Sequence, residues 1–335
     1  MRCALRPLGQ DSSRVADMPI MRARPRGDRG TDGSWSIAMT SPRRRVAVRV
    51  ALPLALILAA CGGSRPTVDF DHPDQRATGS SRKVECVRSG GVVACRGLDE
   101  RGLMGTGRSG PPRPGFVAIE GLRDAVDVAV AGREAFACAL RANHEVWCWG
   151  TNLFGVLGDR VPWFDGAAPD IDRSIAAPGK LDGLPPVVAL AVDAFHACAM
   201  ATGGAVYCWG VNGHGQVADP RRDGREAVSP PCKVPLAGPA VRLVLHDTQS
   251  CALLESEELV CWGGALPSAL GGGPAYAPTV VGRDVRRVSI DRERGETCML
   301  TAAGTTCWSP HAEGALEQFY EPHIRRAVSA GCAAP

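Results

Sequence analysis

Apolar and polar residues recur in a fixed order five times between residues 82 and 335. Each unit has a segment bounded by two cysteines, a glycine-rich stretch and a proline-containing linker, and each unit after the first opens with an alternating or β-branched run. The cysteine-bounded segments are CVRSGGVVACRG, CALRANHEVWCWG, CAMATGGAVYCWG, CALLESEELVCWG and CMLTAAGTTCWS. Their first cysteines are separated by 52, 60, 53 and 47 residues. Short strands and tight turns at this spacing predict the blades of a β-propeller.

The unit predicts four antiparallel strands, so we expect an all-β propeller of about five four-stranded blades, within a range of about five to seven. The runs AVDVAVAG, VVALAVDA, AVRLVLHD and DVRRVSID open the second to fifth units, whereas the first unit follows the polar stretch ATGSSRK. Residues 324–330, near the C-terminus, resemble a further opening run. We expect them to pair into the first blade and close the ring, because an open ring leaves unpaired strand edges.

The cysteine spacing predicts a disulfide across each hairpin. Gly90 and Gly91 lie midway between Cys86 and Cys95, as a two-residue hairpin turn requires. The pairs separated by ten positions need a three-residue loop, such as residues 142–144. Folding about these turns places each pair at opposite strand positions, within disulfide range. The expected bonds are Cys86–Cys95, Cys138–Cys148, Cys198–Cys208, Cys251–Cys261 and Cys298–Cys307.

Two alternatives to these disulfides are a zinc site and reduced cysteines in the core. Structural zinc sites usually bring two cysteines two to four residues apart, a spacing that this chain lacks. Cys232 and Cys332 lie outside the hairpins, and a bond between them is an additional option.

Tryptophan and glycine follow the second cysteine in the middle units. Trp149, Trp209 and Trp262 each stand between a cysteine and a glycine. We expect the ring to pack against the next blade and the glycine to permit a positive φ or a close backbone approach. Stacking against carbohydrate is the alternative role for such rings.

These segments resemble the repeats of the regulator of chromosome condensation family. The pattern CAL…G.V.CWG.N..GQLG is matched by Cys198–Gly215 and Cys138–Gly158, with Asn152 and Asn212 two residues after the glycine. The resemblance covers about residues 82–330. It implies a propeller, usually with about seven blades, and binding of other proteins through loops.

The N-terminal part carries an export pattern. Four arginines at 43–45 and 49 precede the apolar run 50–60, which is too short to span a membrane and typical of a signal peptide. The run ends in Leu58-Ala59-Ala60-Cys61, which resembles the lipobox of bacterial lipoproteins and implies a lipid on Cys61. Gly62 follows, which by resemblance to bacterial sorting rules favours the outer membrane over the inner.

The domain boundaries follow from this pattern. Residues 1–38 show no hydrophobic period and are interpreted as an over-extended start or a disordered leader. Residues 39–60 form the signal peptide, residues 61–81 a flexible tether, and residues 82–335 the propeller.

Charge and cysteine content narrow the function. The chain has a formal net charge of +3, but residues 61–335 contain 27 basic and 31 acidic residues. A nucleic-acid partner is therefore not expected, because such binding needs a basic face. The 14 cysteines fit an oxidising compartment.

Catalytic and cofactor motifs do not fit. The GxGxxG match at residues 105–110 is followed by two prolines, where no helix can begin. No HExxH or GxSxG occurs, so we expect no enzyme, cofactor or metal, although Asp165, Asp170 and Asp172 leave a calcium site as an alternative.

The insert from Asp159 to Pro178 is the candidate binding loop. It carries Trp163 and Phe164, the composition of an interaction hot spot. The alternative is that both rings pack beneath the loop as its own small core.

The sequence thus predicts a lipid-anchored envelope protein whose propeller is a protein-binding or scaffold module. Its partner is an unknown protein, with a glycan as the alternative. The alternative functions are a propeller-type enzyme acting on glycans and a purely structural envelope protein.

Overall fold

The computed structural model describes the chain from residue 68 to residue 310 with gaps. The described residues are 68–70, 74–78, 84–99, 102–131, 136–152, 155–158, 174–193, 196–219, 227–291 and 293–310. Cys61, Trp163, Phe164, Cys332 and residues 324–330 lie outside them. Among these residues, no helix has the length and apolar character needed to cross a bilayer.

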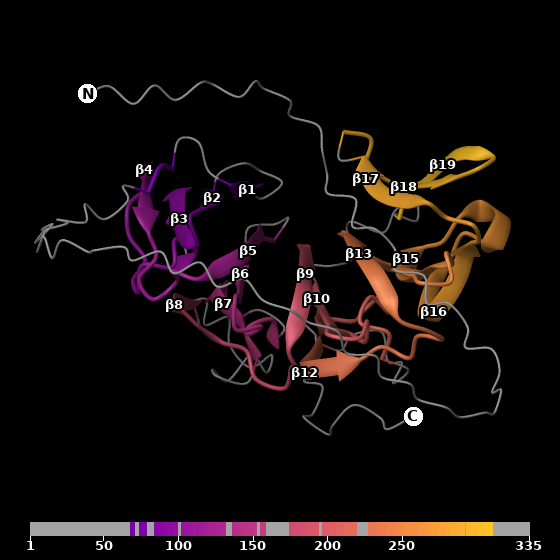
Figure 1. The fold of residues 1–335 in the computed structure, drawn as a ribbon, viewed down its shortest axis with the longest axis horizontal. Helices are drawn as coiled ribbons and strands as arrows, with labels where there is room; N and C mark the ends of the chain where they lie inside the picture. The colour runs from indigo at the N-terminus through magenta and orange to yellow at the C-terminus, as the bar shows by residue number, and fades with distance from the viewer. Residues whose placement is uncertain are drawn as a thin grey trace, which may run out of the picture. The chain divides into compact units, whose positions relative to one another are not determined.

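Within the described residues, nineteen strands form five antiparallel sheets in chain order (Figure 1). The first sheet has β1 (Gln75–Thr78), β2 (Val84–Ser89), β3 (Val92–Gly97) and β4 (Arg113–Ala118). The second has β5 (Ala125–Val130), β6 (Phe136–Arg141), β7 (Val146–Thr151) and β8 (Ser174–Lys180). The third has β9 (Val187–Asp193), β10 (His196–Ala201), β11 (Val206–Val211) and β12 (Ala227–Lys233).

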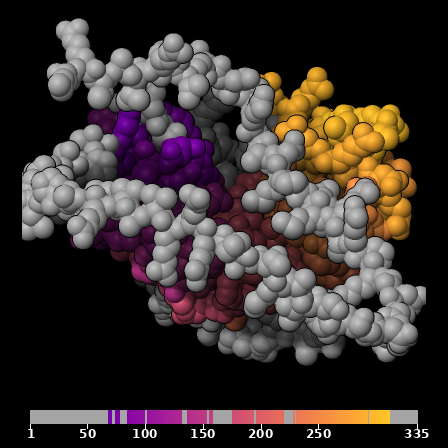
Figure 2. Space-filling view, in the orientation of Figure 1, coloured from indigo at the N-terminus to yellow at the C-terminus, as the bar shows by residue number. Residues whose placement is uncertain are grey.

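The fourth sheet has β13 (Ala240–His246), β14 (Gln249–Leu254), β15 (Leu259–Ala265) and β16 (Pro274–Gly282), with a short 3-10 helix at Ser268–Leu270. The fifth has β17 (Arg287–Asp291), β18 (Glu296–Thr301) and β19 (Gly304–Trp308), three strands within the described residues. First strands of successive sheets contact one another, from β1 to β5, β9, β13 and β17. Each sheet is therefore a blade of a β-propeller, and Figure 2 shows the surfaces of the five blades from indigo to yellow.

The first blade corrects two expectations. Its inner edge, which we assigned to residues 324–330, is occupied by β1, which pairs with β2. The blade therefore begins within residues 61–81, which we assigned to a flexible tether. The strand lacks an apolar pattern because Gln75 faces polar groups: its amide donates to Asp127 Oδ1 at 2.6 Å and accepts from the Val128 N–H at 3.1 Å.

The hairpin turns adopt the conformations that their residues favour. Gly90 and Gly91 have φ values of 54° and 81°, the two positive angles of a type I′ turn. In the second blade, Arg141 N–H donates to the Glu145 carbonyl at 2.9 Å, which closes a three-residue loop with His144 at φ 68°.

These turns place the cysteines opposite one another. The structure joins the five expected pairs, with a Cα–Cα distance of 4.1 Å in each. Cys232 is disulfide-bonded as well.

Each hairpin disulfide in the first four blades lies at the interface with the following blade. Cys86 and Cys95 share a core cluster with Trp149, and Cys138 and Cys148 share one with Trp209. The same holds for the third and fourth disulfides with Trp262 and Trp308. The tryptophans therefore pack against the preceding blade, not the next one as expected, because the strand pleat turns the cysteine and its neighbour to opposite faces.

The tryptophan N–H groups also reach the preceding blade. Trp149, Trp209 and Trp262 donate to the backbone carbonyls of Leu103, Val156 and Gln216 at 2.8–2.9 Å. Trp308 donates to Gln249 Oε1 at 3.2 Å. One buried ring thus provides both apolar contact and a hydrogen bond between neighbouring blades.

Glycine after the tryptophan has the predicted conformational role. Gly150 and Gly210 have φ values of 105° and 101°, a range that favours glycine. Just before each of these glycines, the pairing between the third and the fourth strand of the blade shifts in register, which defines a β-bulge.

The first and last blades depart from this interface. Arg96 takes the tryptophan position in the first blade, forms an ion pair with Glu85 at 2.7 Å and lies 4.5 Å from the Phe116 ring centroid. In the last blade, Cys307 is exposed and Cys298 is 9% exposed, whereas the cysteines of the first four disulfides are at most 1% exposed.

A reductant should therefore open Cys298–Cys307 first, because thiol–disulfide exchange requires access to a sulfur. Brief treatment with a phosphine reductant, followed by alkylation and peptide mass spectrometry, measures the order. Simultaneous labelling of Cys138 and Cys148 would show that the tryptophan cover gives no protection.

Candidate functional site

In the second and third blades, one asparagine anchors the loop after the third strand. Asn152 Oδ1 accepts from Leu157 N–H at 2.8 Å, and its Nδ2 donates to the Gly158 carbonyl at 3.1 Å. Asn212 does the same for Val217 N–H, at 3.0 Å, and the Asp219 carbonyl, at 3.3 Å. These side chains satisfy buried backbone groups and so fix the base of each loop.

The candidate binding loop begins and ends at one edge of the second blade. Thr151 pairs with Ser174, and Gly150 pairs with both Phe136 and Ile175. Residues 174–178, which we assigned to the insert, belong instead to strand β8, so the loop is shorter than predicted. The chain re-enters the sheet at Ser174, beside the turn between β5 and β6. Trp163 and Phe164 lie outside the described residues, so their role stays a prediction.

The first blade has aspartate where the second and third have asparagine. Asp99 Oδ1 accepts from Met104 N–H at 3.3 Å, and Oδ2 lies 3.9 Å from Arg113 Nε. Burial raises the pKa of Asp99, whereas the Met104 hydrogen bond and Arg113 lower it. Aspartate therefore anchors this loop with only one of the two hydrogen bonds that asparagine makes.

A buried polar cluster lies between the third and fourth blades. His196 Nε2 is 3.0 Å from Ser250 Oγ, and Ser250 Oγ donates to the Gln216 carbonyl at 2.9 Å. Both side chains are fully buried, and burial lowers the pKa of His196 to about 3. The hydroxyl thus accepts from a neutral histidine and cannot reach a substrate, so this pair is a structural contact between blades.

This cluster was not predicted, although the sequence carries a signal for it. Residues two positions before the first cysteine are Val84, Phe136, His196, Gln249 and Glu296. At this position the residue is apolar in the first two units and polar from the third unit onward. The residue directly before the cysteine is alanine in the second and third units, Ser250 in the fourth and Thr297 in the fifth. A further polar contact joins the fourth and fifth blades, where His246 Nδ1 lies 3.4 Å from Thr297 Oγ1.

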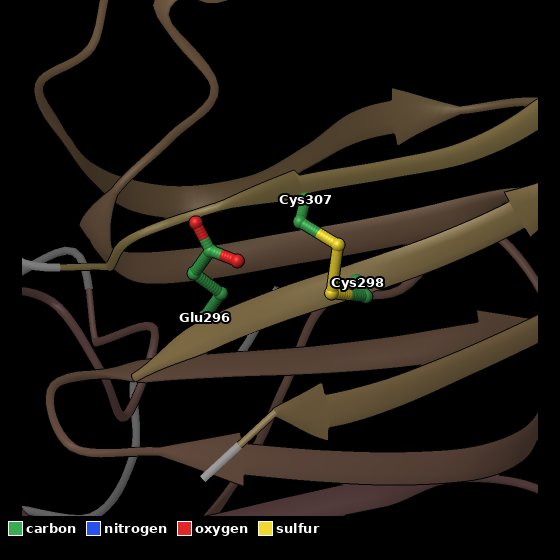
Figure 3. A group of neighbouring side chains, drawn as sticks. All are labelled: Glu296, Cys298 and Cys307. Atoms are coloured by element: carbon green, nitrogen blue, oxygen red, sulfur yellow. A yellow bond between two sulfur atoms is a disulfide. The ribbon is translucent and has the colours of Figure 1, made fainter. Parts of the chain in front are cut away.

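One group of side chains has the proximity of metal ligands. Glu296, Cys298 and Cys307 have ligand atoms within 4.8 Å of one another. Figure 3 shows the three side chains on neighbouring strands. The two sulfurs form a disulfide, however, and zinc and similar metals bind the free thiolate. Glu296 alone does not make a metal site.

Comparisons with known proteins agree with this architecture. Residues 126–156 and 187–216 match the family model described as Regulator of chromosome condensation (RCC1) repeat. The fold is similar to human WBSCR16, with a TM-score of 0.52 and 19% identity over 66% of this chain and 56% of that chain.

The fold is also similar to Prp20p from Saccharomyces cerevisiae, with a TM-score of 0.52 and 20% identity over 67% of this chain and 54% of that chain. A structure of Kap60 bound to yeast RCC1 (Prp20) gives a TM-score of 0.52 and 18% identity, over 72% and 54%. This chain spans about half the length of the structures it matches. It has the fold of a β-propeller, and its second and third units match the RCC1 repeat.

Proposed function

We propose that the chain is an exported lipoprotein whose propeller binds other proteins at the cell envelope. The observation that carries the proposal is the disulfide across each of the five hairpins. Such bonds persist in oxidising compartments and are rare in the cytosol. A chain stabilised in this way is suited to a location outside the cytoplasmic membrane.

The N-terminal pattern supports the membrane anchor. Basic residues, a short apolar run and the sequence Leu58-Ala59-Ala60-Cys61 occur in the order of a lipoprotein signal. One acyl chain binds a membrane only marginally, so stable anchoring needs the several chains that a lipoprotein cysteine carries.

Similar proteins support the binding role. Prp20p is described with its binding properties to Gsp1p and histones, and yeast RCC1 (Prp20) is found in a complex with Kap60. In this chain, a partner protein would contact the loops anchored by Asn152 and Asn212 and the insert predicted at residues 159–178. The partner would be an envelope or extracellular protein.

Lipidation can be tested in the expressed full chain. We expect a fatty-acid probe to label the wild type in the membrane fraction and not Cys61→Ser. Both proteins keep the same signal peptide, and an immunoblot of each sample shows whether they are expressed in equal amounts. Equal labelling of both proteins would contradict the anchor.

The candidate loop can be tested separately. We expect Trp163→Ala with Phe164→Ala to weaken capture of an envelope partner at least about tenfold, because large aromatic side chains dominate interface energies. The melting temperature should change little if the rings contact the partner. A large drop in melting temperature would instead place both rings in the core of the loop.

A further inference from the structure

The inner strands carry one equivalent position in all five blades. In each case the residue pairs with the one two positions after the first hairpin cysteine. The five residues at this position are Gln75, Asp127, Ala189, Arg242 and Arg287. The chemistry changes around the propeller, from an amide and a carboxylate to two guanidinium groups on neighbouring strands.

A third arginine lies beside these two. Arg286 directly precedes β17, and its N–H donates to the Leu300 carbonyl at 2.8 Å. Arg242, Arg286 and Arg287 are all exposed. Strands β13 and β17 contact each other, and Arg242 and Arg287 occupy equivalent register positions on them. We call the three exposed arginines the arginine patch.

The arginine patch has no ion-pair partner within the part of the chain that the structure describes. Two acidic groups of the same two blades are paired with other arginines, Glu258 with Arg283 and Asp291 with Arg294. Glu255, Glu257 and Asp284 are exposed, and within the described residues they form no ion pair with the patch. Residues 61–335 carry more acidic than basic residues, so the patch does not reflect a general excess of positive charge. Exposed guanidinium groups favour binding of carboxylates, which they can contact through two parallel hydrogen bonds.

An apolar residue adjoins the patch because the inner strand bulges. The pairing of β13 with β14 shifts between Ala240 and Arg242, which leaves Val241 out of register and 50% exposed. The same shift leaves Val126 and Val188 49% and 45% exposed in the second and third blades. The inner strands of the second, third and fourth blades thus each expose one valine, and the last of these precedes Arg242 of the patch.

We propose that the arginine patch and Val241 bind an acidic segment of a protein partner, with glutamate or aspartate on the arginines and aliphatic side chains on the valines. This deepens the proposed function and rests on it. A nucleic acid fits less well, because three arginines on two strands form no track along a phosphate backbone and the rest of the mature chain is acidic.

The test uses the disulfide-bonded mature chain and a fluorescent peptide composed of glutamate and leucine. Anisotropy titrations at low and moderate salt give the affinity. The variant carries Arg242→Gln, Arg286→Gln and Arg287→Gln. The control carries Arg123→Gln, Arg283→Gln and Arg294→Gln, three exposed arginines outside the patch, so that both proteins lose the same charge.

We expect the patch variant to lose at least about tenfold in affinity and the control to stay within about twofold, with equal melting temperatures. Equal losses in both proteins would overturn the inference, because net charge would then explain binding. Patch-dependent binding of a single-stranded oligonucleotide that is tighter than binding of the peptide would overturn the protein partner. In either case Cys61 labelling and partner capture still decide the proposed function on their own.

Discussion

Replacing Trp209 with alanine should lower the free energy of unfolding by about 3–5 kcal/mol, as for other large buried aromatic side chains. The ring is fully buried among residues of the second and third blades, including Cys138 and Cys148. Its N–H donates to the Val156 carbonyl at 2.9 Å. Alanine would remove the apolar contact between two blades and leave a buried carbonyl unpaired.

Trp147→Ala provides a matched control. Trp147 is partly exposed, its N–H donates to the Glu145 carboxylate, and the Arg141 guanidinium lies 4.6 Å from its ring centroid. We expect this change to cost clearly less than Trp209→Ala in urea unfolding of the oxidised chain. Equal costs would mean that burial between blades does not determine stability.

Acid should destabilise the protein through His196. The pKa of His196 is lowered to about 3 by burial, whereas an exposed or unfolded histidine has a value near 6.5. The unfolded chain therefore binds a proton that the folded chain excludes between these two values. The stability contributed by the neutral side chain is present above pH 6.5 and falls by about 1.4 kcal/mol per pH unit below it, or about 2 kcal/mol at pH 5.

A variant with His196→Phe and Ser250→Ala isolates this effect. It reproduces the pair that the preceding interface already contains, Phe136 in the second blade and Ala197 in the third. Urea unfolding of both proteins from pH 7.5 to pH 4.5 gives the difference in free energy. That difference should grow as the pH falls, and parallel curves would rule out His196 as the titrating group.

Features encoded by neighbouring residues could be predicted from the sequence. The five hairpins follow from turn residues such as Gly90 and Gly91 and from cysteine spacing, and both signals are local. The strand β1 could not be predicted, because its position is stabilised by the Gln75–Asp127 hydrogen bond across 52 residues. We predicted an inner strand at residues 324–330 from their alternating apolar residues. Strand β1 lacks this pattern.

Contacts between units were harder to predict than the units themselves. The sequence indicates that tryptophan packs between blades, but the strand pleat determines which neighbour it meets. The His196–Ser250 contact joins residues 54 positions apart, so only the fold shows that a polar residue in one unit is matched by another in the next. The arginine patch was missed for the same reason, since the strands that carry Arg242 and Arg287 become neighbours only in the folded chain.

The tryptophan of one blade and the disulfide of the blade before it also bear on how such a chain can change length in evolution. Because every internal interface uses the same two parts, an in-frame duplication or loss of a whole middle unit recreates a complete interface at the new junction. A copy of the first blade would not fit at an internal position. Its Arg96–Glu85 ion pair would face the disulfide of the preceding blade, where the other blades place an apolar ring. Changes in the number of blades should therefore arise by recombination within the second to fourth units, while the first unit remains the N-terminal one.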